Sequence, residues 1–249
     1  MSSLYQQWII PSNTLQLREH EVHVWRASLE ASELVIQNLE CVLTKDEATK
    51  ATRFRFEKDR KHWTVARAIL RILLSRYVHT DPSQLRFGSN AYGKPFLAFP
   101  SLSPPLYFNL SHSGGLVLYA FSYTRRVGID VEYKRADIDY DSLAKVSFSP
   151  NEQSLLYSLP GDIKRDAFFH CWTRKEAYIK AMGKGLSIPT NQFDVTLIPG
   201  EPAALLQSRE DPREITRWSL QELAPGTGYT GALAVEGTGW SLSCWKWDN

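Results

Sequence analysis

The sequence lacks the features of membrane-spanning, secreted and disulfide-bonded proteins. Its longest apolar runs, such as Ile69 to Leu74 broken by Arg71, fall far short of the roughly 20 residues that a membrane span needs. The first residues, Met1 to Tyr5, show neither the basic start nor the apolar run of a secretory signal. The three cysteines are an odd number, at spacings that match no zinc pattern. We therefore expect reduced thiols, no structural zinc and a cytoplasmic protein.

A large excess of charge of one sign is also absent, since the formal net charge is +2. The distribution is nevertheless uneven: residues 45–76 carry ten Lys and Arg against four acids, and residues 127–170 carry eight acids against five bases. A local cationic stretch beside an acidic one favours a phosphorylated or acidic partner, although two solvated surfaces without a role explain the charges equally well. No recognised nucleic-acid-binding motif accompanies the basic stretch, so we expect no nucleic-acid partner.

What the sequence does contain is enough apolar residue, 43% of 249, for an ordinary packed core. Two capping boxes, Thr44-x-x-Glu47 and Ser149-x-x-Glu152, each predict a helix start, because hydroxyl and carboxylate satisfy two orphan amides there. Apolar periodicity predicts longer helices over about 58–78 and 163–182. Alternation and apolar runs predict strands over 21–29, 106–110, 116–123, 127–132, 193–197, 215–220, 229–235 and 240–245.

The second half of the sequence repeats the plan of the first. Each capping box is followed by a long helix that carries a Trp-Thr pair, at Trp63 and at Trp172. The echo suggests an internal duplication, which would give two similar α/β halves facing each other across a cleft. We place the division between 1–126 and 127–249.

The segment from Val127 to Glu132 is the first with a chemical pattern. On a strand, Asp130 and Glu132 point to one face, and two carboxylates about 7 Å apart repel each other unless a cation lies between them. A Mg²⁺ ion held by carboxylates and a substrate phosphate is one solution. An edge strand whose acids lie in water is the other.

A second pattern lies on the predicted helix 163–182. Trp172, Glu176 and Lys180 are four residues apart and form one stripe. At this spacing Glu176 and Lys180 could form a plain surface ion pair. The aromatic residues around them indicate a largely buried helix, where such a pair needs a metal or phosphate partner.

Two further segments carry polar residues at turns. Ser111-His112 could place a hydroxyl and an imidazole on a phosphate, form part of a hydrolase dyad, or make a simple turn; the sequence has no nucleophile elbow to support a hydrolase. Residues 88–94 match the start of a phosphate-binding P-loop, but Pro95 replaces the required Ser or Thr. What survives is a rigid turn that presents Lys94 as a point charge.

Taken in order, these segments resemble the Sfp-type 4′-phosphopantetheinyl transferases. The resemblance rests on four motifs, Tyr-Gly-Lys-Pro at 92–95, Phe-Asn-Leu-Ser-His-Ser at 108–113, Gly-Ile-Asp-Val-Glu at 128–132 and Trp-Thr-Arg-Lys-Glu-Ala-Tyr-Ile-Lys at 172–180. It is close over residues 85–190 and looser over 53–71. Any one motif is weak, whereas four in order are specific.

The resemblance implies an α+β fold of two similar halves with the active site in the cleft between them. It implies transfer of the phosphopantetheine arm of coenzyme A (CoA) to a serine of an acyl carrier protein or of a peptidyl or polyketide carrier domain. A Mg²⁺ ion would be held by Asp130, Glu132 and Glu176, and Lys180 and Lys175 would contact phosphate oxygens. Glu176, or a water that it orients, would serve as base.

The same resemblance assigns the remaining residues to CoA. Ser111 and His112, with the preceding Asn109, would lie near the 3′-phosphate side, and the turn of Tyr92, Gly93, Lys94 and Pro95 near the adenine. Arg67 would contact the 3′-phosphate, and Arg60 is added on charge alone.

We expect a monomer, because each chain supplies both halves, with no membrane partner. Two other functions are weighed: a non-catalytic module that binds CoA or a carrier protein, and an unrelated metal-dependent phosphohydrolase. A binding module would keep the basic contacts and dispense with the acids, whereas all three acids are present.

Overall fold

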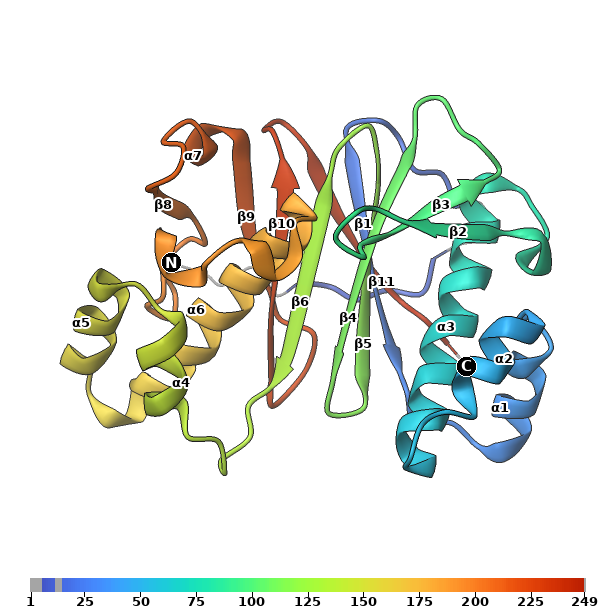
Figure 1. The fold of residues 1–249 in the computed structure, drawn as a ribbon, viewed down its shortest axis with the longest axis horizontal. Coiled ribbons are helices and arrows are strands. Elements are labelled where there is room, and N and C mark those ends of the chain that lie inside the picture. The colour runs from blue at the N-terminus through green and yellow to red at the C-terminus, as the bar shows by residue number, and fades with distance from the viewer. Residues whose placement is uncertain (1–5, 12–14, 249) are drawn as a thin grey trace.

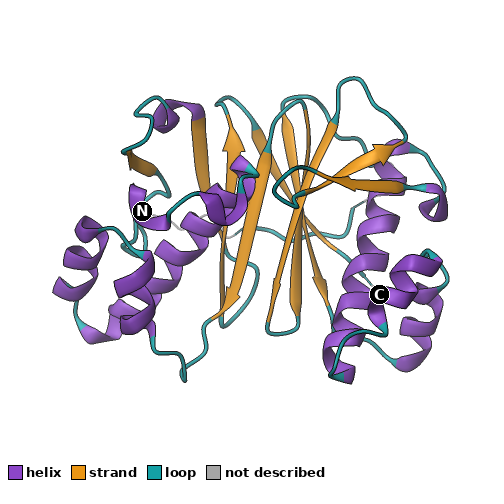
Figure 2. Ribbon diagram, viewed as in Figure 1, coloured by secondary structure: helices purple, strands orange, loops and turns teal. Residues whose placement is uncertain are grey.

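Two helices of 22 residues each, α3 (Glu57–Val78) and α6 (Gly161–Met182), cover the outer faces of two β-sheets in the computed structural model, which describes residues 6–11 and 15–248 (Figure 1). The sheets stand side by side in the middle of the molecule, with helices on both flanks (Figure 2). The strands of the first sheet, in spatial order, are β11 (Ser241–Lys246), β1 (Glu21–Ser28), β5 (Leu116–Tyr123) and β4 (Leu106–Ser113). Those of the second are β6 (Val127–Tyr133), β10 (Tyr229–Glu236) and β9 (Trp218–Leu223).

The two halves repeat one topology, as the sequence predicted. The antiparallel order β1-β5-β4 in the first sheet matches the antiparallel order β6-β10-β9 in the second. A small hairpin accompanies each sheet, β2 (Arg86–Ser89) with β3 (Pro95–Phe99), and β7 (Phe193–Val195) with β8 (Leu205–Ser208). Each half also has two shorter helices, α1 (Glu33–Glu40) and α2 (Lys45–Ala51), then α4 (Tyr140–Ser147) and α5 (Pro150–Ser158).

The capping boxes show how the duplication is preserved. Both are formed as predicted, at the starts of α2 and α5. Each capping glutamate also binds a basic residue of the long helix: Glu47 accepts from Arg71 at 2.6 Å, and Glu152 lies 2.8 Å from Lys175. Arg71 and Lys175 hold the same position, since 71 − 57 and 175 − 161 both equal 14. The Trp-Thr echo, by contrast, is coincidental, because Trp63 lies near the start of α3 and Trp172 lies past the middle of α6.

Three apolar clusters form the core. One lies between α3 and the first sheet and a second between α6 and the second sheet. The third lies between the sheets themselves, where valines of β1 and β6 pack with leucines of β5, β9 and β10. The faces of the central strands therefore alternate between a helix and the other sheet, so β5, β6 and β10 are buried on both faces.

The last strand, β11, belongs to the sheet of the first half. Strand β11 was expected beside the other strands of the second half, but it pairs in parallel with β1 at the far edge of the first sheet. Gln6 in turn hydrogen-bonds the backbone at Glu222 and Ala224 in the second half. Both ends of the described chain therefore contact the opposite half.

Other differences from the expected elements are local. The strand expected over 215–220 is a short helix, α7 (Glu214–Arg217), followed by β9, because Glu214 is buried and accepts hydrogen bonds from Tyr178 and Trp218. Helices α1 and α4 and strands β2, β3 and β8 were not predicted; they are short and carry little periodicity. Short 3₁₀ segments cover Pro82–Gln84, Gly185–Ser187 and Thr190–Gln192. Among the described residues, no helix combines the length and apolar character needed to cross a bilayer.

A buried polar chain fixes α3 to the first sheet. The indole Nε1 of Trp25 donates to the hydroxyl of Tyr77 at 2.7 Å, which leaves the hydroxyl proton of Tyr77 for Nδ1 of His23 at 2.9 Å. Burial lowers the pKa of His23 to about 4, against a smaller opposing effect of Glu21. His23 is therefore neutral in the folded chain over the usual working range.

We predict that this histidine makes the fold acid-sensitive. Because its pKa falls from about 6.5 in the unfolded chain to about 4 in the fold, only the unfolded chain takes up a proton as the pH drops through this window. Between pH 7 and pH 5 the wild type should lose about 2 kcal/mol more unfolding free energy than His23→Gln, which keeps an acceptor for Tyr77. Urea denaturation at both pH values measures this, and equal losses in the two proteins would contradict it.

Candidate active site

The two sheets meet along β4 and β6, the facing edge strands, and polar side chains link them. Asn109 accepts from the backbone amide of Ile129 at 2.8 Å, and Ser111 donates to Asp130 at 2.8 Å. Ser113 donates to Glu132 at 2.7 Å. The three residues of β4 alternate along the strand, so all three side chains face β6. We call this contact the β4–β6 seam.

Helix α6 approaches β6 to within backbone contact. A Cβ atom on Gly128 would lie 2.1 Å from the carbonyl oxygen of Ala177 and 2.2 Å from the amide nitrogen of Ala181. Only glycine fits at this position, and the alanines on the facing side of α6 allow the approach. The close contact brings the acids of β6 beside the polar stripe of α6.

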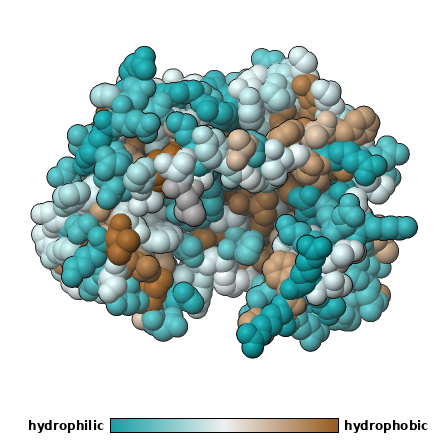
Figure 3. Space-filling view, in the orientation of Figure 1, coloured by the Kyte–Doolittle hydropathy of each residue, from teal (hydrophilic) through white to brown (hydrophobic). Residues whose placement is uncertain are grey.

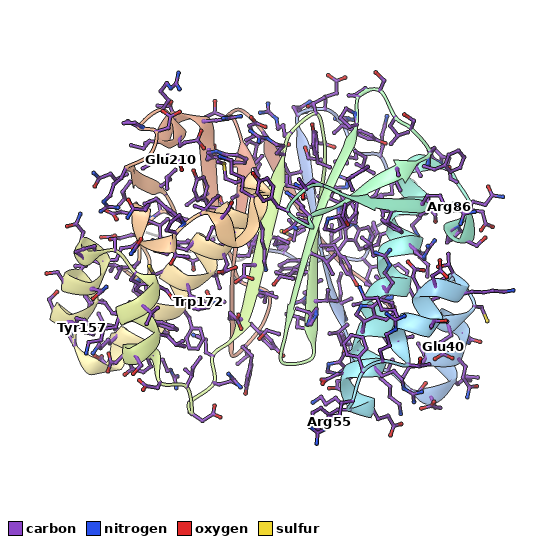
Figure 4. The ribbon with its side chains drawn as sticks, viewed as in Figure 1. Glu40, Arg55, Arg86, Tyr157, Trp172 and Glu210 are labelled. Atoms are coloured by element: carbon purple, nitrogen blue, oxygen red, sulfur yellow. The ribbon has the colours of Figure 1, made fainter. Side chains whose placement is uncertain are left out.

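The predicted stripe of Trp172, Glu176 and Lys180 faces this seam. These residues line one cleft of about 470 Å³ together with residues of β4 and β6: Leu110, Ser111, His112, Asp130 and Glu132. Trp172 is seen on α6 in Figure 4, and the molecular surface is recessed between the two halves in Figure 3. Residues from three elements thus meet at the junction of the halves.

Asp130 is the most buried acid of the cleft. Its Oδ1 accepts from Lys180 at 2.6 Å and from Ser111 at 2.8 Å, while its buried Oδ2 has no hydrogen-bond partner among the described residues. Burial raises the pKa of Asp130, and the Lys180 ammonium opposes the rise. Lys180 therefore pairs with Asp130, across the strand–helix contact, rather than with Glu176 on its own helix.

The two other acids share this environment. Burial raises the pKa of Glu132 and of Glu176, and the charge of Asp130 raises both further. The hydroxyl of Ser113 partly offsets the effect at Glu132, and Lys180 does so at Glu176. A carboxylate that disfavours the charge of two neighbouring carboxyls favours a cation between them.

The donor chemistry of the cleft suits a hard divalent ion, because carboxylate oxygens are the ligands that Mg²⁺ and Ca²⁺ prefer. The unpartnered Oδ2 of Asp130 is one donor ready for such an ion. However, no group of three or more His, Cys, Asp and Glu side chains within the described ranges is gathered closely enough to hold a metal. The chemistry of the donors fits an ion, while a complete ligand set is not formed.

His112 lies at the exposed rim of the cleft. Partial burial lowers its pKa, and the charges of Lys180 and His62 lower it further. The neutral form of the imidazole is therefore favoured at the rim of the cleft.

Lys175, expected at a phosphate, is a structural residue instead. Its side chain is 2% exposed, and its ammonium lies 2.8 Å from Glu152 and donates to the carbonyls of Thr190 and Phe193 at 2.7 and 2.6 Å. These partners use all three of its protons. Lys175 therefore ties α6 to α5 and β7 and does not face the cleft.

Lys94 is likewise committed to the protein. Its ammonium donates to the carbonyl oxygens of Val127 at 2.9 Å and Ala181 at 3.3 Å, and burial lowers its pKa to about 8. The Asn90 side chain binds the Gly183 carbonyl at 2.8 Å. The turn at 92–95 thus docks the hairpin of the first half onto the end of α6, with Tyr92 exposed and Gly93 at a φ of +87°.

The remaining candidates of the first half lie outside the cleft lining. Arg67 binds Glu47 and stacks its guanidinium 3.8 Å from the ring centre of Phe87, while Arg60 is exposed and lies 4.0 Å from Glu57. Arg71, one turn along α3 from Arg67, is buried and also binds Glu47. Asn109 is buried in the seam and serves the fold directly.

Sequence reasoning missed three residues that shape the cleft. Leu110 lines it, Ser113 holds Glu132, and Gly128 permits the helix contact. Alternation along β4 from Asn109 could have indicated Ser113, since strand residues two apart share a face. The need for glycine at 128 depends on a helix about 50 residues away and has no local signal.

Comparisons with known proteins agree on one family. A family model for the 4′-phosphopantetheinyl transferase superfamily matches residues 126–234, and one for the N-terminal part of a 4′-phosphopantetheinyl transferase matches residues 23–124. The 4′-phosphopantetheinyl transferase HetI of Nostoc sp. is 41% identical over 98% of this chain and 100% of its own length. The 4′-phosphopantetheinyl transferase Sfp of Bacillus subtilis is 37% identical over 62% of this chain and 66% of its own.

Among solved structures, a complex of ACPS with CoA from Chronobacterium ammoniagenes covers 46% of this chain and 98% of its own chain. Its TM-score is 0.33 and its identity 18%, which is too low a likeness to inform the geometry of the cleft.

The contact at Gly128 generates a prediction about stability. Gly128→Ala should lower the unfolding free energy by about 2 kcal/mol or more, because the added methyl group must displace the backbone of α6. Gly161→Ala, at the first residue of the same helix and with open space around it, is the matched control and should stay within about 0.5 kcal/mol. Chemical denaturation compares the two, and a Gly128→Ala protein as stable as the control would refute the contact.

Proposed function

The chain belongs to the 4′-phosphopantetheinyl transferase superfamily, and we propose that it transfers the 4′-phosphopantetheine arm of CoA to a serine of an acyl, peptidyl or polyketide carrier protein, releasing adenosine 3′,5′-bisphosphate. The observation that carries the proposal is the cleft at the β4–β6 seam. There Ser111 and His112 of the first half meet the acids of β6 and the Glu176–Lys180 stripe of α6.

The transfer breaks the P–O bond between the two phosphates of CoA and forms a bond from the pantetheine phosphorus to the serine oxygen. The leaving group, adenosine 3′,5′-bisphosphate, is already part of CoA, so the protein contributes mainly positioning and neutralisation of charge. The proton of the serine hydroxyl must leave as the new bond forms, which requires a base within hydrogen-bond reach.

Glu176 is the proposed base. Burial and the charge of Asp130 raise its pKa, which makes the carboxylate a stronger proton acceptor. Its place on the stripe, one turn before Lys180, puts acceptor and cation on the same wall of the cleft. Lys180 would stabilise negative charge on the phosphates.

Asp130, Glu132 and Glu176 are the proposed ligands of a Mg²⁺ ion. When bound, the ion would neutralise the charge that develops on the diphosphate as its bond breaks. Within the chain, Ser111 and Lys180 orient Asp130 so that one oxygen stays available.

The remaining contacts with CoA are proposed from the rim of the cleft. Ser111 and His112 would meet the 3′-phosphate side, and Tyr92 and the exposed part of its turn the adenine. Arg67 stays a proposed contact of the 3′-phosphate, and its guanidinium would keep its hydrogen bond to Glu47 there. The ammonium groups of Lys94 and Lys175 are excluded, because backbone carbonyls already hold them.

The proposal includes a monomer acting in the cytoplasm. Each chain supplies both walls of the cleft, so a second copy is not needed to complete it. The three cysteines, Cys41, Cys171 and Cys244, are free thiols, which agrees with a reducing compartment.

We predict that Asp130→Asn and Glu176→Gln each reduce transfer by about 100-fold or more, because each removes one carboxylate charge while keeping the shape of the side chain. The assay incubates the chain with CoA, Mg²⁺ and an apo carrier protein and follows the carrier's mass, which rises by the phosphopantetheine arm. Glu40→Gln, an exposed acid among the helices of the first half, is the control and should transfer normally (Figure 4).

The same assay separates the alternatives. A binding module would retain CoA without changing the carrier's mass, and a phosphohydrolase would release adenosine 3′,5′-bisphosphate without any carrier. Chelation by EDTA should stop transfer and added Mg²⁺ should restore it. Full transfer by either carboxamide variant would remove that residue from the proposed site.

A further inference from the structure

Ser113 holds one carboxyl of the cleft in a defined orientation. Its hydroxyl oxygen accepts the backbone N–H of Tyr133 at 3.1 Å, and its oxygen lies 2.7 Å from Oε2 of Glu132. A serine hydroxyl has one proton to give. Since the bond from Tyr133 uses its acceptor side, that proton points to Glu132.

The position of Glu132 explains why such a bond matters. It is the second-last residue of β6, where the strand leaves the sheet, and its side chain is half-buried. A glutamate side chain has three rotatable bonds, and fixing it costs up to about 2 kcal/mol of conformational entropy. The hydrogen bond from Ser113 already restricts the Glu132 side chain in the folded protein, so less conformational entropy is lost when a ligand binds.

The seam is well placed to supply this donor. Ser113 lies on β4, in the first half, whereas Glu132 lies on β6, in the second. Strands β4 and β6 belong to different sheets, and side-chain bonds of this kind link them across the seam. The bond at 113 is the one nearest the end of both strands.

We propose that Ser113 is a positioning residue, which acts through Glu132 to pre-organise the divalent-cation site. This inference rests on the proposed function, because it takes Glu132 as a metal ligand. Residues that orient metal ligands typically change metal affinity by 10–100-fold when they are removed.

The test is the affinity of the chain for Mn²⁺ alone, followed through the electron paramagnetic resonance signal of the unbound ion. Ser113→Ala should weaken Mn²⁺ binding about 10-fold, and Ser113→Thr, which retains a hydroxyl, should stay within about 2-fold of the wild type. Ser122→Ala is the control: this buried serine of β5 bonds only to carbonyls, those of Glu21 and Tyr123, among the described residues. It should bind Mn²⁺ normally.

A double mutant separates positioning from a general effect on structure. In a Glu132→Gln background, Ser113→Ala should cause no further loss of Mn²⁺ affinity, because the residue through which it acts is already changed. A further loss would show that Ser113 acts elsewhere. Equal Mn²⁺ binding by Ser113→Ala and wild type would also overturn the inference.

The proposed function can fail independently. A wild-type chain that transfers the phosphopantetheine arm but binds no Mn²⁺ by itself overturns this inference and leaves the function intact. A chain that binds Mn²⁺ in a Ser113-dependent way, but leaves the carrier's mass unchanged, keeps the inference and removes the transferase proposal.

Discussion

The backbone contact between strand β6 and helix α6 is the constraint on which the cleft depends. At Gly128 the two elements touch without an intervening side chain, and this closeness lets Lys180 on the helix reach Asp130 on the strand. A larger residue would hold the helix away and separate the acids of the strand from those of the helix. The arrangement of the acids in the cleft therefore requires a residue without a Cβ atom at position 128.

Equivalent strand–helix contacts in the two halves carry different side chains. Trp25 of β1 and Asp130 of β6 correspond, since each pairs with the fourth residue of the next strand in its sheet, Tyr119 or Ala232. In the first half Trp25 hydrogen-bonds Tyr77 of α3, whereas in the second half Asp130 binds Lys180 of α6. The same strand–helix contact is a sealed core in one half and a polar cleft in the other.

The sequence predicted those parts of the site whose pattern is local. Alternation placed Asp130 and Glu132 on one face, and the four-residue spacing placed Glu176 and Lys180 on one stripe. It could not predict which way the Lys175 side chain points, although the motif puts this residue beside Glu176. Glu152 and two carbonyls distant in the sequence bind the Lys175 ammonium and fix that direction. The partners of a buried lysine come from the whole fold, whereas a motif records only its neighbours in the chain.

The location of the cleft at the β4–β6 seam links its chemistry to the whole fold. Ser111 comes from the first half and Asp130 from the second, so neither half alone holds the carboxyl in its observed setting. The apolar layer between the sheets and the return of β11 to β1 also bind the halves. Apolar interfaces of this kind resist sliding, because a core is close-packed. The distances across the cleft are consequently set by the packing of two sheets, and the few polar bonds of the seam only refine them.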